Sequence, residues 1–145
     1  MISSAAMLER PSCTILCVDD NAAALEVRAG VLAHHGFDVV ALQEERDALA
    51  YLADHAVHCV VLDYLMPEIR GDKLATMIRE RYPALPIVLI SGAVDDPEDI
   101  GGADLFVSKS AGHRRLLEAL DELSPRWASN ARSAEELTDT DERVA

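Results

Sequence analysis

Several apolar runs of this sequence end in polar side chains that suit metal or phosphate chemistry. These side chains are two adjacent carboxylates, Asp19 and Asp20, a third carboxylate, Asp63, the Ser91 hydroxyl and the Lys109 ammonium group. The runs before them are short, continuous and rich in β-branched residues, which is typical of strands buried on both faces of a parallel sheet. Parallel strands bring their carboxyl ends to one edge of the sheet, where ligands bind. We therefore expect these side chains to converge on one site.

Clustered carboxylates need a counter-charge. Two like charges about 4 Å apart repel by about 4 kcal/mol at an effective dielectric constant of 20. Three repel by several times that amount, which is large against a domain stability of roughly 5–15 kcal/mol. The acids must therefore protonate, pair with Lys109 or hold a cation. Mg²⁺ favours a few carboxylates with retained waters, which leaves room for a phosphoryl group.

The elements that must position this site alternate along the chain. The patterns predict strands at 13–18, 37–42, 58–63, 85–91 and 104–109. They also predict a first helix that ends near His35 and three further helices at about 44–56, 72–81 and 111–123. Gly36 is expected to end the first helix, whose inner side carries Leu25 and Leu32. This alternation predicts an α/β fold in which helices cover both faces of a parallel sheet.

The sequence resembles a response-regulator receiver domain over roughly residues 13–123. The matching motifs are VDDN at 18–21, VVLDYLMPEIRG at 60–71, LISG at 89–92 and FVSK at 106–109. The most specific of them is the Asp-x-x-Met-Pro-x-x-x-Gly stretch behind an apolar strand. The resemblance implies a doubly wound, flavodoxin-like sheet of five parallel strands in the order 2-1-3-4-5.

The resemblance also implies a phosphorylation site with a bound Mg²⁺. Asp63 matches the phospho-accepting aspartate. Asp19 and Asp20 match the acidic pair that holds Mg²⁺, together with Asp63 and the backbone carbonyl of Leu65. The chemistry is consistent, because a carboxylate can act as a nucleophile toward phosphorus and form an aspartyl-phosphate.

Three further residues match the parts of the family that contact the phosphoryl group and respond to it. Lys109 matches the lysine that pairs with the phosphoryl group, and Ser91 matches the hydroxyl that bonds it and moves on activation. Phe106 matches the switching aromatic residue. Such donors and counter-charges suit the charge that phosphoryl transfer spreads over three oxygens. Without the resemblance, Lys109 is a solvated lysine at a strand end, Ser91 a turn residue and Phe106 a core residue.

One departure from the family follows the lysine. Ser110 stands where the family usually has a proline in a cis peptide bond. A cis bond without proline costs ~2.5–4 kcal/mol, against ~0.5–1 kcal/mol before proline. We therefore favour a trans peptide between Lys109 and Ser110.

A second departure lies between the fourth and fifth strands, where the family normally has a full helix. Pro97 can open a helix there, but Gly101 and Gly102 close it after about one turn. We therefore expect a shortened fourth helix and a remodelled partner face. We also expect the segment 93–103 to make few packing contacts and to change most on phosphorylation.

The sequence predicts three regions: an N-terminal extension at 1–12, the receiver domain at 13–123 and an acidic tail at 124–145. Pro125 breaks the last helix, and the small and charged residues after it are typical of a disordered or loosely packed tail. Alternatively, Trp127 anchors the tail on the domain or on a partner.

Charge and cysteine content limit the partners and the location. A net charge of −13 argues against binding to nucleic acid or to an anionic membrane. The odd number of cysteines argues against a disulfide framework, and the histidines lack the spacing of zinc ligands. No run approaches the ~20 apolar residues that span a bilayer, and the N-terminus does not resemble a signal peptide. We therefore expect a cytoplasmic protein.

The expected function is that of a phospho-accepting receiver in a two-component phosphorelay, acting as a stand-alone switch through protein contact. Its partners would be a sensor histidine kinase or a histidine phosphotransfer protein, with a downstream protein target. It would not be an enzyme beyond its own phosphorylation and dephosphorylation on Asp63. The alternatives are a relay intermediate that passes the phosphoryl group to a histidine protein, and a degenerate receiver that binds partners without phosphorylation.

Overall fold

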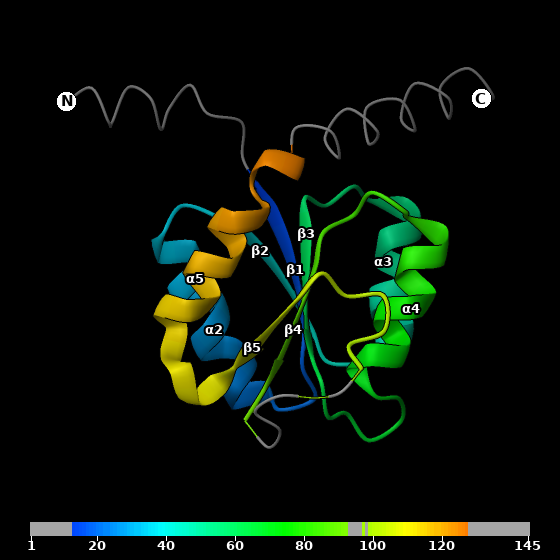
Figure 1. The fold of residues 1–145 in the computed structure, drawn as a ribbon, viewed down its shortest axis with the longest axis horizontal. Coiled ribbons are helices and arrows are strands. Elements are labelled where there is room, and N and C mark those ends of the chain that lie inside the picture. Colours follow the sequence, from blue (N-terminus) through cyan, green and yellow to red (C-terminus); the bar gives the residue numbers. More distant parts are fainter. Residues whose placement is uncertain (1–12, 93–96, 98, 128–145) are drawn as a thin grey trace.

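The computed structural model describes residues 13–92, 97 and 99–127. They form an α/β fold around a sheet of five strands in the order β2-β1-β3-β4-β5 (Figure 1). This confirms the predicted fold class and strand order. The predicted extension at 1–12 and residues 128–145 of the predicted tail lie outside the described residues.

All neighbouring strands of the sheet pair in parallel. The strands are β1 (Thr14–Val18), β2 (Asp38–Leu42), β3 (Cys59–Asp63), β4 (Ile87–Ser91) and β5 (Leu105–Ser108). The three central strands are buried along almost their whole length, whereas the edge strands β2 and β5 are partly open. This explains why the central strands read as unbroken apolar runs.

Helices cover both faces of the sheet. They are α2 (Ala22–His34), α3 (Glu45–Asp54), α4 (Gly71–Arg81) and α5 (Gly112–Leu123), and a short 3₁₀ helix, η1 (Lys109–Ala111), precedes α5. Helices α2 and α5 lie on one face, and α3 and α4 on the other (Figure 1). Alternate strand residues feed two separate cores, one under each pair of helices. Helix α2 ends at His34, and the predicted stop Gly36 follows two residues later with a φ of 94°, which favours glycine.

The connection from β4 to β5 differs from the prediction of one helical turn that opens at Pro97. Its described residues form no helix, and Gly101 and Gly102 form a turn. The turn lies directly on α4: a Cβ on Gly101 would overlap the Asp72 carbonyl oxygen, and one on Gly102 would lie 2.7 Å from the Ala75 carbonyl oxygen. The expectation of few packing contacts is therefore wrong for these glycines, because a backbone without side chains can approach the helix closely.

Arg79 of α4 fastens this connection to the start of β5. Its Nε donates a hydrogen bond to the Gly102 carbonyl oxygen at 3.0 Å, and its Nη2 donates to the Asp104 carboxylate at 2.6 Å. The same carboxylate accepts the Ile87 backbone N–H at 2.8 Å and pairs with Arg126 beyond α5. Asp104 thus joins both helical layers to the sheet at the start of β5.

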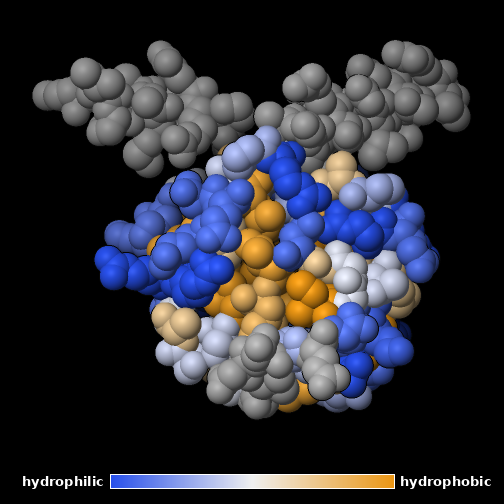
Figure 2. Space-filling model, viewed as in Figure 1, coloured by the Kyte–Doolittle hydropathy of each residue, from blue (hydrophilic) through white to orange (hydrophobic). Residues whose placement is uncertain are grey.

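Apolar side chains of β5 and of the described residues just before it are partly open to solvent. Figure 2 shows hydrophobic residues gathered between the hydrophilic surfaces of α5 and α4. Partly buried hydrophobic residues of this region are Ile100, Ala103, Leu105 and Phe106. We call these four residues the β5 strip.

The chain beyond α5 is held on the domain at Trp127. The Trp127 ring packs edge to face on Phe37, with ring centroids 5.6 Å apart, and it lies against the core under α2 and α5. Trp127 therefore anchors the start of the predicted tail on the domain.

Candidate functional site

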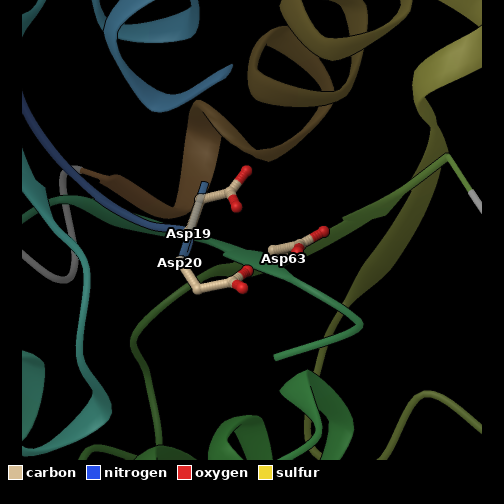
Figure 3. Close-up of side chains that lie close together, drawn as sticks. All are labelled: Asp19, Asp20 and Asp63. Atoms are coloured by element: carbon tan, nitrogen blue, oxygen red, sulfur yellow. The ribbon is translucent and has the colours of Figure 1, made fainter. Parts of the chain in front are cut away.

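Three carboxylates come together at the carboxyl ends of the central strands. Asp19 and Asp20 directly follow β1, and Asp63 is the last residue of β3. The parallel register pairs Val18 with Leu62, so the two strands end side by side. One oxygen of each carboxylate lies within 4.8 Å of the others (Figure 3). The structure thus brings together the acidic residues that the strand ends predict.

The three carboxylates have different surroundings. The side chains of Asp19 and Asp20 leave the chain in different directions, and Asp19 is fully buried whereas Asp20 is exposed (Figure 3). The Asp19 Oδ1 atom accepts the Asn21 backbone N–H at 2.9 Å. Its Oδ2 atom accepts a hydrogen bond from Arg28 Nη1 at 3.0 Å and lies 3.4 Å from Lys109 Nζ. Asp19 is therefore held from several sides.

Arg28 was missed by the sequence reasoning. It lies on the inner face of α2 between Leu25 and Leu32, and all three are buried. The signal was present in the sequence, because an arginine at helical spacing between two inward leucines needs a buried partner.

Asp63 is almost completely buried, and Lys109 Nζ lies 3.3 Å from its Oδ1 atom. Burial, followed by the neighbouring Asp19 charge, raises the pKa of Asp63 to about 6, against the opposing charges of Lys109 and Arg28. The protonated form of Asp63 is thus favoured mainly because the carboxyl is buried, and secondly because it lies beside the Asp19 charge.

Ser91 and Phe106 lie on the neighbouring strands. Ser91 is buried at the end of β4, one residue beyond Ile90, which pairs with Asp63. Phe106 packs on the core under α3 and α4, and its ring lies edge to face with Tyr64 at a centroid distance of 6.4 Å. Core packing of Phe106 is observed, and its switching role stays a prediction.

The loop after β3 explains the spacing of the most specific motif. The Gly71 backbone N–H donates to the Tyr64 carbonyl oxygen at 2.7 Å, and a Cβ on Gly71 would overlap the Asp63 carbonyl oxygen. Only glycine allows this close return of the chain. The loop also leaves Leu65 exposed, two residues after Asp63, where its carbonyl is expected to serve as a ligand.

The comparisons with known proteins agree with this geometry. The model of the response regulator receiver domain family matches residues 15–121. The chain belongs to this family. Receiver domains of response regulators act in two-component signalling, so this coarse function is established for the chain.

Two relatives of the receiver domain are longer proteins. This chain is 37% identical over 109 residues to the response regulator protein FleR of Pseudomonas aeruginosa, and the match covers 72% of this chain and 23% of FleR. This chain is 30% identical over 146 aligned positions to the response regulator protein TodT of Pseudomonas putida, and the match covers 96% of this chain and 64% of TodT. The chain thus spans less than two thirds of either relative.

A solved structure supports the same assignment. The response regulator protein TrrA of Thermotoga maritima, in complex with Mg²⁺ and BeF, is 27% identical with a TM-score of 0.72, and the match covers 77% of this chain and 98% of TrrA. Another structure shows TrrA in complex with the histidine kinase ThkA.

The receiver's lysine is the first residue of η1. The Lys109–Ser110 peptide is trans, as predicted, since the described residues contain no cis peptide bond. Gly92 leaves space beside this lysine, because a Cβ there would lie 3.5 Å from Lys109 Cδ, an ordinary contact distance.

The donors of the receiver site fit Mg²⁺. The three carboxylates and the expected Leu65 carbonyl are all oxygen ligands, which hard cations prefer. Within the described part of the chain, no other cluster of metal-binding side chains occurs. Cys17 does not offer a thiolate, because burial raises its pKa to about 12. Within that same part of the chain, no helix has the length and apolar character to cross a membrane.

Proposed function

We propose that this receiver accepts a phosphoryl group on Asp63 and works as a stand-alone switch that signals by protein contact. The observation that carries the proposal is the joint placement of the three carboxylates within 4.8 Å and of Lys109 Nζ at 3.3 Å from Asp63 Oδ1. This arrangement combines a nucleophile, a cation site and a fixed ammonium group at one edge of the sheet.

In the proposed reaction, an Asp63 carboxylate oxygen forms a bond to phosphorus while the bond from phosphorus to the donor's imidazole nitrogen breaks. The imidazole leaves with the bonding electron pair and takes up a proton. Lys109 neutralises the phosphoryl oxygens, and the Ser91 hydroxyl donates a hydrogen bond to one of them. Mg²⁺, when held by Asp19, Asp20, Asp63 and the Leu65 carbonyl, supplies the remaining positive charge.

The proposed donor is a sensor histidine kinase or a histidine phosphotransfer protein, as the ThkA complex of the 27% identical TrrA suggests. We place the protein in the cytoplasm, where the thiols of Cys13, Cys17 and Cys59 stay reduced. We propose no enzymatic activity beyond phosphorylation and dephosphorylation of Asp63 itself.

The proposed output is a protein contact rather than binding to nucleic acid or a membrane. The net charge of −13 opposes contact with polyanions. The β5 strip offers partly open apolar surface along the strand that leads to Lys109 (Figure 2). Apolar surface of this kind is typical of protein interaction sites.

Incubation with Mg²⁺ and acetyl phosphate tests the phosphorylation, with intact-mass analysis as the readout. We expect one base-labile phosphoryl group on the wild type and none on Asp63→Asn. The matched control is Asp38→Asn, an exposed aspartate of β2, which should be phosphorylated like the wild type. Incorporation into Asp63→Asn would place the acceptor elsewhere.

The second candidate function is a relay intermediate, which uses the same site. It is distinguished by adding an unphosphorylated histidine phosphotransfer protein to the phosphorylated receiver. Loss of the phosphoryl group to that protein would favour the relay, whereas slow hydrolysis without transfer would favour the switch. A degenerate receiver would show no incorporation in the first experiment.

A further inference from the structure

The buried ion pair between Arg28 and Asp19 is a feature that receiver chemistry does not explain. Arg28 is 4% exposed and Asp19 is 0% exposed, and the Nη1–Oδ2 distance is 3.0 Å. Arg28 comes from the middle of α2, on the face that packs against the sheet beside Leu25 and Leu32. An apolar residue at this place would suit the core, so the guanidinium group needs another reason.

Stabilisation of the fold is a weak reason for the buried pair of Arg28 and Asp19. Removing two charges from water costs several kcal/mol per ion, and a buried pair often contributes no more than apolar residues of the same volume. The partner of Arg28 is one of the three carboxylates that meet at the cation site. The pair therefore concerns the electrostatics of the site.

The hydrogen bonds of Asp19 show what Arg28 does there. An ionised carboxylate offers about four lone-pair positions. On Asp19, three donors already use them: Asn21 N–H on Oδ1, and Arg28 and Lys109 on Oδ2. Asp19 thus has little capacity left for a cation, while Asp20 is exposed.

The charge balance points the same way. The three carboxylates carry −3, and Lys109 and Arg28 bring +2, which leaves −1 at the site. Without Arg28 the balance is −2.

We propose that Arg28 is a positioning residue and resident counter-charge of the cation site, which fixes Asp19 and weakens Mg²⁺ binding. The inference rests on the proposed function, because it assumes that the acidic cluster holds Mg²⁺. Asp20 and Asp63 then carry most of the charge that attracts the cation. Arg28 also allows the acidic cluster to remain folded when no cation is bound.

The test compares Mg²⁺ affinities of wild type, Arg28→Gln and Arg28→Met, measured by calorimetry and by melting temperature as a function of Mg²⁺ concentration. A unit charge a few ångströms from a divalent ion changes affinity by about tenfold even in a medium as polar as water. We therefore expect both neutral variants to bind Mg²⁺ about tenfold more tightly and to melt at lower temperature without it.

Two controls separate local from general effects. Arg28→Lys keeps the charge and should bind Mg²⁺ within about threefold of wild type. Arg81→Gln removes the same charge from the exposed far end of α4 and should leave the affinity unchanged. If Arg28→Met does not fold, Arg28→Gln keeps a polar partner for Asp19 and decides the question.

The outcomes are distinct. Tighter binding by the neutral Arg28 variants, with unchanged controls, supports the inference. Lower melting temperature with unchanged or weaker Mg²⁺ binding overturns it and leaves Arg28 a structural residue. Absence of Mg²⁺ binding by the wild type overturns the inference together with the cation site of the proposed function.

Discussion

The buried charge of Asp63 makes the cation-free receiver less stable at neutral pH. Substituting Asp63 by asparagine removes this charge while it keeps the size of the side chain. Asp63 is 6% exposed, and burial followed by the Asp19 charge raises its pKa from the ordinary value of 3.8 to about 6. Folding therefore favours the protonated form of Asp63.

The sign and size of the effect follow from this pKa. A group whose pKa is raised on folding contributes stability below its ordinary pKa and loses it as the pH rises through the folded value. For Asp63 the loss occurs between about pH 4 and pH 6–7. At 1.36 kcal/mol per pKa unit, the difference between 3.8 and about 6 gives about 3 kcal/mol as an upper value. Allowing for screening by water, we expect about 1–3 kcal/mol.

The assay is urea unfolding in the presence of a chelator at pH 4.5, 6 and 7.5. Asp63→Asn should be more stable than wild type by about 1–3 kcal/mol at pH 7.5, and the difference should shrink toward pH 4.5. The exposed variant Asp38→Asn should stay within about 0.5 kcal/mol of wild type at each pH. Added Mg²⁺ should stabilise wild type more than Asp63→Asn, because the ion binds only the folded site.

A constant difference between Asp63→Asn and wild type over this pH range would refute the reasoning. Ionisation of Asp63 would then not lower the free energy of unfolding, because Lys109 and Arg28 would fully offset the burial of its charge. A wild type that is more stable at pH 7.5 than the variant would reverse the sign and exclude a raised pKa.

Other predictions follow from the connection to β5 and from the strand starts. Gly101→Ala should destabilise the fold by about 1–3 kcal/mol in urea titration, because its φ is 59° and its Cβ would overlap the backbone of α4, whereas Gly92→Ala should cost less than about 1 kcal/mol. His58 Nδ1 accepts the Thr14 backbone N–H at 3.1 Å, and burial lowers the pKa of His58. The stability that neutral His58 contributes is therefore present above pH 6.5 and lost as the pH falls. In urea titrations, His58→Gln should lose less stability than wild type between pH 6.5 and 5. Phosphorylation should change hydrogen exchange most within 92–109, with little change at 44–56; the reverse pattern would contradict the signalling route.

Much of the site was predictable from chain order alone. Strand periodicity places Asp19, Asp63, Ser91 and Lys109 at strand ends, and parallel pairing of neighbouring strands brings these ends to one edge. The prediction depends on topology rather than on side-chain packing. It therefore needs no knowledge of how the helices rotate about their axes.

The features that were not predicted depend on that rotation and on close approach of backbones. Arg28 meets Asp19 only because α2 turns this one face to the end of β1. Asp104 meets Arg79 and Arg126 across a large distance in sequence. A single sequence shows the charges but does not show which of them are brought together.

The described residues between β4 and β5 form no helix, and this changes where a signal can travel. The turn of Gly101 and Gly102 lies on α4, and Arg79 ties α4 to Asp104 at the start of β5. Helix α4 and the start of β5 are therefore held together, whereas Lys109 at the other end of β5 contacts the acceptor site. A displacement of Lys109 on phosphorylation must then be absorbed along β5 itself. Phe106 lies on this short strand and is partly open to solvent, so we expect its surroundings to form the surface that a partner detects.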